Sequence, residues 1–180
     1  MVLLTTTASG IEVSGETVLA MTKGMRGFRK RLRHLLAQRG LDDPRPNHWY
    51  SQDDLVDVFE ALAAAVGPFT IYDMGAQVAH DAEFPAEVDS VERALTQIDA
   101  FHRAGHRGAT AGSYIFEKTG KRFGTMVCKT PYPCDFDRGL IEAVAERFRP
   151  EKAWNVTVKH DESAACRKRG SDSCTYTVQW

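Results

Sequence analysis

The sequence predicts an α+β protein in which a helical N-terminal half packs on a four-stranded antiparallel sheet. Between Met25 and Ala104 the apolar residues recur with helical spacing, whereas from Gly108 onward they alternate with the two-residue period of strands. One further helical pattern, at 135–147, interrupts the strands. We therefore expect one long helix inserted between two pairs of strands.

Residues 1–19 are rich in Thr, Ser and Gly and show no clear period, so we predict an N-terminal arm at 1–24; the alternative is that Val13 and Val18 belong to a short strand. A single domain follows at 25–180, with a helical half at 25–107 and a sheet-and-helix half at 108–180. The chain of 180 residues, with 43% hydrophobic and 26% charged residues, fits one globular domain. Its formal net charge of −1 gives no general attraction to nucleic acid or to anionic membranes.

No apolar run approaches the roughly 18 residues that a membrane-spanning helix needs, and no basic segment precedes the apolar N-terminus. We therefore expect a cytoplasmic protein, in which thiols stay reduced. In that compartment, clustered cysteines indicate a metal site or simple burial before they indicate disulfides.

The first predicted helix, Met25–Arg39, has an apolar stripe and a basic opposite face, and Gly40 is suited to end it. We interpret the basic face as a solvated surface, because acidic helices downstream balance its charge; the alternative is contact with nucleic acid or an acidic partner. The second helix begins at Ser51, which is suited to be its N-cap, and ends at Gly67-Pro68.

The third and fourth helices are predicted at Phe69–His80 and Asp89–Ala104, with Asp89 as the N-cap of the fourth. His102 and His106 are four residues apart, a spacing that places two imidazoles on one face of a continuous helix and suits a metal or a haem iron. Gly105 is expected to end the helix between them, which argues against their acting as a ligand pair.

Four strands are predicted in the second half: Ser113–Lys118, Arg122–Lys129, Trp154–His160 and Cys174–Trp180. The turn Thr119-Gly120-Lys121 joins the first two as a hairpin. The helix Asp135–Arg147 is expected to cover the sheet with its apolar side, leaving polar residues such as Asp137 on its outer side.

Three of the four cysteines lie in the last quarter of the chain: Cys134, Cys166 and Cys174. Cys134 precedes the helix at 135–147, whose dipole favours a thiolate, and the other two flank a Gly-containing turn and can face each other. Zinc takes four ligands from Cys, His and carboxylate side chains. Three residues compete for the fourth position: Glu162, His160 and Cys128. The alternative is that the cysteines are small buried hydrophobes.

Two segments resemble the 4-vinyl reductase domain: P-C-D-F-D-R-G-L-I-E-A-V-A-E-R-F at 133–148 and C-R-K-R-G-S-D-S-C-T-Y-T-V at 166–178. That family is related in fold to the haem-NO-binding family and to TRAPP vesicle-tethering subunits. The resemblance covers 108–180, and the helical half agrees in layout only. It implies an antiparallel sheet with helices, a frequent homodimer, and an enclosed small hydrophobic molecule.

The resemblance also implies a zinc site. In the aromatic-sensing members of this superfamily, zinc is held by a cysteine before the long helix, two cysteines around the last turn and an acidic residue. The cysteine positions match Cys134, Cys166 and Cys174 here. The acidic position falls on Ser163, with Glu162 beside it, so Glu162 is the expected fourth ligand.

Haem is not the cofactor that we expect from the sequence. The resemblance to the haem-NO-binding family implies a proximal histidine on a helix and a Tyr-x-Ser-x-Arg element, and this chain contains no such element. His102 and His106 are the candidate haem ligands.

We expect a domain that senses or binds a small hydrophobic molecule and signals through a protein partner or a homodimer. The expected pocket lies between the helical half and the sheet, lined by aromatic side chains: Trp49, Tyr50, Phe101, Tyr114, Phe116 and Trp154. The alternatives are a tetrapyrrole-processing enzyme component of the vinyl reductase kind, a haem-based gas sensor, and a non-binding adaptor. Catalytic and nucleotide-binding motifs are absent from the sequence, so an enzyme is the less expected function.

Overall fold

The computed structural model describes residues 10–25, 29–108 and 111–180, with no side-chain description for 29–32. Its helices are α1 (Gly15–Gly24), α2 (Arg29–Ala37), α3 (Gln52–Val66), α4 (Pro68–Asp81), α5 (Val91–Ala104) and α6 (Cys134–Arg147). Its strands are β1 (Glu12–Ser14), β2 (Trp49–Ser51), β3 (His106–Arg107), β4 (Ser113–Gly120), β5 (Phe123–Lys129), β6 (Thr157–His160) and β7 (Cys174–Gln179). A short 3-10 helix, η2 (Arg167–Arg169), precedes β7.

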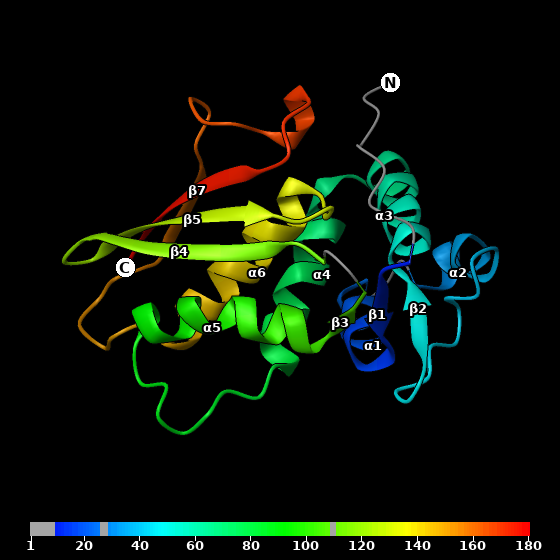
Figure 1. Ribbon diagram of the computed structural model, residues 1–180, viewed down its shortest axis with the longest axis horizontal. Coiled ribbons are helices and arrows are strands. Elements are labelled where there is room, and N and C mark those ends of the chain that lie inside the picture. The colour runs from blue at the N-terminus through cyan, green and yellow to red at the C-terminus, as the bar shows by residue number, and fades with distance from the viewer. Residues whose placement is uncertain (1–9, 26–28, 109–110) are drawn as a thin grey trace.

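The larger sheet has the strand order β4-β5-β7-β6, with every neighbouring pair antiparallel. Helix α6 enters the chain between β5 and β6, and it lies against one face of the sheet together with α5 (Figure 1). Alternate residues of the central strands, such as Met126 and Tyr176, are wholly buried under these helices. The predicted α+β architecture with one long inserted helix is therefore confirmed.

Residues 10–24 do not form the predicted N-terminal arm. Strand β1 is the centre of a three-stranded sheet with the order β2-β1-β3, in which Val13 pairs with Tyr50 and with His106. Helix α1 follows at once, with the side chain of Ser14 accepting a hydrogen bond from the backbone at Thr17. The Thr and Gly content of this segment obscured a pattern of buried residues that ties it into the core.

The predicted helix Met25–Arg39 is shorter than expected. Helix α2 covers Arg29–Ala37, and Met25 instead caps the C-terminus of α1. Residues 26–28 of the predicted helix lie outside the described part of the chain. Ser51 does cap α3, and Gly67 separates α3 from α4 as expected.

Two glycines set the distance between α4 and α6, the most extensively packed pair of helices. A Cβ atom on Gly75 would lie 2.1 Å from the carbonyl oxygen of Phe136, and one on Gly139 would lie 2.1 Å from that of Tyr72. Only glycine permits this approach of the two backbones. The contact fixes α6, and with it both functional regions described below.

Helix α5 begins at Val91 with Ser90, not Asp89, at its N-cap position. It ends at Ala104, before His106, as Gly105 predicted. Strand β6 begins at Thr157, and Trp154 lies in the preceding loop with 98% of its surface exposed. Over the part of the chain that the structure describes, none of the helices is long and apolar enough for a membrane crossing.

Candidate functional site

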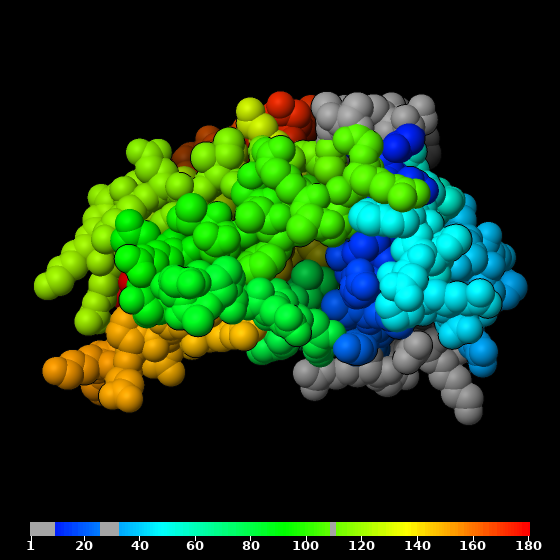
Figure 2. All heavy atoms as spheres, turned by 60° about the horizontal axis from the view of Figure 1, so that its bottom comes forward, coloured from blue at the N-terminus to red at the C-terminus, as the bar shows by residue number. Residues whose placement is uncertain are grey.

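A cavity of about 750 Å³, which we call the chamber, lies between α1, α4, α5 and α6. In Figure 2 the surface is hollowed between the blue atoms of the α1 region and the green atoms of the α5 region. Apolar side chains form much of the wall: Met21, Val78, Ile98, Phe101, Leu140 and Val144. The chamber arises because the apolar stripes of α5 and α6 face inward and leave a space that no side chain fills.

Two stacked histidines, His102 and His106, form part of the chamber wall, with their ring centroids 4.0 Å apart. The Nε2 of His102 lies 2.6 Å from the carbonyl oxygen of Ala111, and the Nδ1 of His106 lies 2.6 Å from the carbonyl oxygen of His102. A carbonyl oxygen accepts hydrogen bonds and cannot donate them, so each of these two ring nitrogens carries the hydrogen of its imidazole. The free lone pairs are therefore on Nδ1 of His102 and on Nε2 of His106.

Both histidines are neutral near pH 7. Burial lowers the pKa of His102, and burial together with the neighbouring His102 lowers the pKa of His106 from 6.5 to about 3. A neutral imidazole with one nitrogen held by a carbonyl is the form that binds a metal ion. The chamber therefore presents two nitrogen donors in an apolar wall.

Tyr132 completes this polar region of the wall. Its hydroxyl lies 2.5 Å from Nε2 of His106 and donates the hydrogen bond, because that nitrogen has the lone pair. Burial raises the pKa of Tyr132, so the phenol stays protonated. Gln52, at the start of α3, is completely buried, and its side-chain amide is close enough to the Tyr132 hydroxyl for a hydrogen bond that opposes this rise in pKa. Tyr132 and Gln52 carry no sequence motif and were not predicted.

The rim of the chamber is predominantly acidic. Its charged residues are Glu16, Lys23, Asp81 and Glu83. Lys23 is the one lysine or arginine among the described residues of the wall, and its amine is paired with Asp81 at 2.6 Å. A guest that carries two negative charges would meet little compensating charge at this rim.

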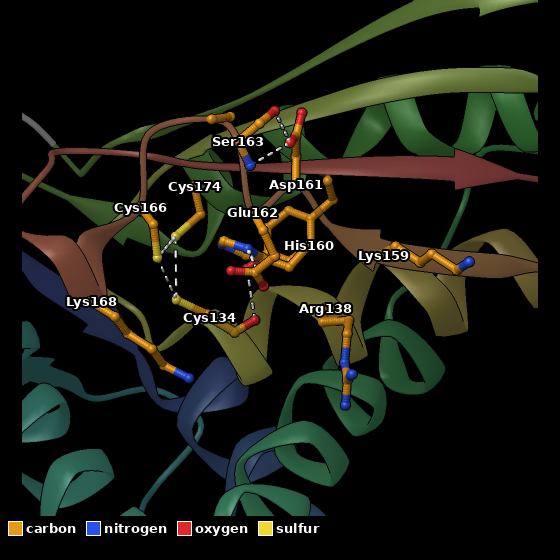
Figure 3. Close-up of polar contacts among 12 residues, drawn as sticks. Cys134, Arg138, Lys159, His160, Asp161, Glu162, Ser163, Cys166, Lys168 and Cys174 are labelled. Atoms are coloured by element: carbon orange, nitrogen blue, oxygen red, sulfur yellow. Dashed lines mark hydrogen bonds and ion pairs between the residues drawn. The ribbon is translucent and has the colours of Figure 1, made fainter.

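A second region, which we call the thiol cluster, consists of Cys134, Cys166 and Cys174, and Figure 3 shows their sulfur atoms facing one another. The Cys134–Cys174 sulfur distance is 3.3 Å, and Cys166 lies 3.8 Å from Cys174 and 4.0 Å from Cys134. Cys134 comes from the start of α6, Cys166 from the residue before η2, and Cys174 from the start of β7. The structure thus brings together the three cysteines that the sequence singled out.

The expected fourth ligand, Glu162, is not part of this group. His160 is, since one of its ring nitrogens lies within 4.8 Å of every sulfur. The side chain of Glu162 is 83% exposed, and its carboxylate lies 3.4 Å from Nδ1 of His160. The Nε2 of His160 is buried and lacks a partner in the described part of the chain. Glu162 lies outside the group because it follows β6 in a turn, whereas β6 itself directs His160 toward the cysteines.

A buried polar network connects the chamber wall with the thiol cluster. Asp137, in the first turns of α6, accepts a hydrogen bond from Tyr114 at 2.7 Å and one from Thr130 at 3.3 Å, and it forms an ion pair with Arg167. The backbone N–H of Arg167 donates to the sulfur of Cys174 over 3.5 Å. The hydrogen bond from Cys134 is the main cause that lowers the pKa of Cys174, and the Arg167 charge adds to it.

The six aromatic residues predicted to line a pocket separate into two groups. Phe101 and Tyr114 lie on the chamber wall. The other four lie elsewhere among the described residues: Trp49 beneath the guanidinium of Arg107, Tyr50 in β2, Phe116 beside Trp180, and Trp154 in solvent.

No protein-family model matches the chain, and no curated protein is significantly similar to it. Solved structures do match over almost the whole chain. A structure titled "Probing the function of heme distortion in the H-NOX family" has a TM-score of 0.69 at 19% identity, covering 93% of this chain and 94% of that one. An Fe(II) unliganded H-NOX protein mutant from K. algicida gives 0.68 at 11% identity, covering 92% and 95%.

A third structure, an oxygen binding H-NOX domain related to soluble guanylate cyclases, has a TM-score of 0.62 at 17% identity, covering 92% of this chain and 94% of that one. At these identities the likeness shows a shared fold. It supports the haem-NO-binding part of the resemblance and does not show a 4-vinyl reductase domain.

The comparisons correct the expected cofactor. We expected zinc and considered haem unlikely, but the matching structures name heme, Fe(II) and oxygen binding. Nothing in them supports zinc as the cofactor. The expectation was wrong because it depended on the missing Tyr-x-Ser-x-Arg element and on the cysteines, and it gave too little weight to the histidines that the fold places in the chamber.

Proposed function

We propose that this chain is a haem-based gas-sensor domain, in which the chamber would hold haem and a histidine of the chamber wall would bind its iron. One observation carries the proposal. His102 and His106 are buried, neutral, and each held by a backbone carbonyl through one nitrogen, so that the other nitrogen keeps its lone pair. The fold likeness to H-NOX structures supports it.

The residues of the chamber fit a haem in three respects. The volume of about 750 Å³ lies within the range of roughly 300–1,000 Å³ that is typical of ligand pockets. Histidine is the proximal ligand of many haem proteins, and a ligating histidine usually donates its other N–H to a carbonyl or carboxylate. The apolar wall would exclude water from both faces of the macrocycle.

When bound, haem supplies the iron that binds a diatomic gas. The protein contributes a fixed neutral imidazole, because burial keeps His106 and His102 unprotonated near pH 7. Met21, Phe101 and Leu140 would contribute apolar surface for a bound haem. A gas-sensor domain of this kind signals through a protein partner or a homodimer, which we retain as part of the proposal.

The acidic rim favours a second candidate, a domain that senses a neutral or cationic hydrophobic molecule. The rim holds the carboxylates of Glu16, Asp81 and Glu83, and Lys23 is the available countercharge for two propionates on the described wall. An uncharged or positively charged guest would avoid this repulsion. The two candidates share the chamber and differ in the charge of the guest.

A titration of the purified protein with hemin tests the proposal. Ala20, which is buried on the chamber wall, is replaced by phenylalanine to fill the chamber, and the exposed Ala64 is replaced by phenylalanine as a matched control. We expect saturable binding of one hemin per chain, lost in A20F and retained in A64F. Saturable binding of an uncharged or cationic apolar dye, blocked by A20F, without any hemin binding would favour the second candidate.

The assignment of the thiol cluster as a metal site stays a prediction that no comparison tests. Three thiols and the unpartnered Nε2 of His160 supply four donors of the kind that soft divalent ions accept. Elemental analysis of the purified protein and of its Cys174→Ser variant tests it. A stoichiometric metal ion that the variant loses supports the assignment, and a metal-free protein contradicts it.

A further inference from the structure

We infer that the uncovered face of the larger sheet is a dimer interface, which packs against the same face of a second copy of this chain. The inference deepens one part of the proposed function, the signalling through a homodimer, by naming the surface that would form it. It rests on that part alone, because the surface lies outside the chamber and does not depend on the guest.

The helices cover only one face of this sheet. Lys118 of β4 forms an ion pair with Glu92 of α5, and Tyr176 of β7 is wholly buried on that same side. The residues that alternate with these point to the opposite side, which we call the outer face. All its members are exposed or half-buried, although α5 and α6 cover the other side (Figure 1). The outer face includes Ile115, Glu117, Phe123, Val127, Thr177 and Lys159.

Exposed apolar side chains gather on and beside the outer face. Four large hydrophobic residues are exposed in the described part of the chain: Phe69, Ile115, Phe123 and Trp154. Ile115 and Phe123 lie on the outer face itself. Trp154, which is 98% exposed, lies three residues before Thr157, and Thr157 is in line with Phe123 across the sheet. Apolar residues that cluster in this way mark an interaction surface, and tryptophan is enriched where interfaces gain most of their energy.

The outer face also carries one charge of each sign in a single row. Glu117 on the edge strand β4 and Lys159 on the edge strand β6 are separated by two threonines, Thr125 and Thr177. Three strand spacings put the two backbones about 14 Å apart, which is too far for a direct ion pair within the chain. Both side chains are exposed, and neither forms an ion pair with a described residue. Figure 3 shows the side chain of Lys159 extending away from the thiol cluster.

A second copy of the chain would pair both ends of this row. A two-fold axis along the strands, between two stacked sheets, keeps each residue at its level and exchanges the two edges. Glu117 then faces Lys159 of the second copy across the roughly 10 Å that separate packed sheets, and Phe123 faces Gln179 of that copy. An axis across the strands would instead bring Glu117 against its own copy, so the charges select the first arrangement.

The same row disfavours other occupants of the outer face. A partner protein or a membrane surface with a single sign of charge would attract one end of the row and repel the other. An interface with two-fold symmetry uses the same patch on both subunits, so this face supplies its own complementary charges. A second copy is therefore the occupant that we expect.

The size of the outer face sets the strength of the dimer. Four strands of up to eight residues cover about 20 Å in each direction, or about 400 Å² on each copy. A standard stable interface buries about 800 Å² on each partner. We therefore expect a reversible dimer that dissociates on dilution.

Sedimentation equilibrium at a series of protein concentrations tests the arrangement. Glu117→Lys and Lys159→Glu each place like charges opposite each other at two symmetric positions, so each should raise the dissociation constant of the dimer at least about tenfold. The double variant E117K/K159E restores opposite charges and should dimerise like the wild-type protein. Glu60→Lys, the same charge change at an exposed position of α3, is the matched control and should leave the dissociation constant unchanged.

The apolar part of the face is tested in the same way. Phe123→Ser should weaken the dimer about tenfold, whereas Phe69→Ser, at an exposed phenylalanine outside the outer face, should not change it. This pair decides the matter if a charge variant does not fold. A wild-type protein that stays monomeric at every concentration, or that binds lipid vesicles through Phe123 without dimerising, overturns the inference. So does a dimer that the double variant fails to restore.

Hemin titration of the same samples separates this inference from the proposal of haem in the chamber. A monomer that binds hemin overturns the dimer interface and leaves the haem proposal intact. A dimer that obeys the charge exchange but binds no hemin supports the interface and contradicts the haem proposal.

Discussion

Asp137 on α6 and Arg167 on η2 form an ion pair that is sealed inside the protein, with side-chain exposures of 0% and 6%. Asp137 also accepts from Tyr114, and Arg167 donates to the carbonyl oxygen of Cys128 at 2.7 Å. Because Tyr114 lines the chamber and the backbone of Arg167 contacts Cys174, this pair holds the two functional regions in a fixed relation.

The first prediction concerns this pair. Arg167→Met leaves the carboxylate of Asp137 buried without its partner, so we expect a loss of about 3–5 kcal/mol in the free energy of unfolding. The adjacent Lys168, which is 65% exposed and lies 3.4 Å from Asp135, is the control, and Lys168→Met should cost less than about 1 kcal/mol. Urea unfolding measures both, and equal losses would contradict the structural role of the pair.

The second prediction concerns pH. The pKa of His106 is about 3 in the folded protein and 6.5 ordinarily, so the unfolded chain binds the proton first as the pH falls. The stability that neutral His106 contributes is complete above pH 6.5 and is lost progressively toward pH 3. Between about pH 7 and about pH 5, His106 should cost the wild-type protein roughly 2 kcal/mol in the free energy of unfolding. His106→Gln should lack this part of the loss.

The exposed His80 provides the matched control for replacing a histidine by glutamine. Urea unfolding at a series of pH values gives the dependence of the free energy of unfolding on pH. If His106→Gln has the same pH dependence as the wild-type protein, the imidazole of His106 is not buried as the structure has it.

The third prediction tests the contact between α4 and α6. Gly139→Ala places a methyl group against the backbone of Tyr72, so we expect a loss of about 3 kcal/mol or a failure to fold. Gly120, where a Cβ atom would lie 3.5 Å from its nearest neighbour, is the matched control. Gly120→Ala should change the free energy of unfolding by less than about 1 kcal/mol. Thermal unfolding compares the variants, and a stable G139A protein would refute the close approach.

The sheet and its inserted helix were predictable because their patterns are strong. Strand β5 alternates between buried and more exposed residues over its whole length, and Phe136, Leu140, Ile141 and Val144 recur at helical spacing on the buried side of α6. The N-terminal segment was not predictable, since β1 is three residues long and gains its stability from pairing with β2 and β3, which are distant in sequence.

The thiol cluster was easier to predict from the sequence than the polar network that connects it with the chamber. The position of Cys134 before a helix and the turn between Cys166 and Cys174 are local features, and they predicted the three cysteines. Asp137 was placed on the polar side of α6, but it is completely buried because Arg167 reaches it from η2. Such a contact depends on tertiary packing and leaves no periodic signal.

The chamber was the least predictable part. His102 and His106 were recognised as a pair, but their value as ligands depends on hydrogen bonds to two backbone carbonyls that no spacing reveals. Trp154 was expected in the pocket on the basis of its aromatic ring, yet it lies in the loop before β6 and is exposed to solvent. Aromatic composition alone did not distinguish a chamber wall from an exposed loop.

The absorption spectrum of hemin-loaded, reduced protein before and after addition of carbon monoxide is the most direct test of the account. We predict one haem per chain, a spectrum of imidazole-ligated ferrous iron, and a shift of the main band when the gas binds. A protein that retains no haem after gel filtration, or whose spectrum does not respond to the gas, would contradict the proposal of a haem-based gas sensor.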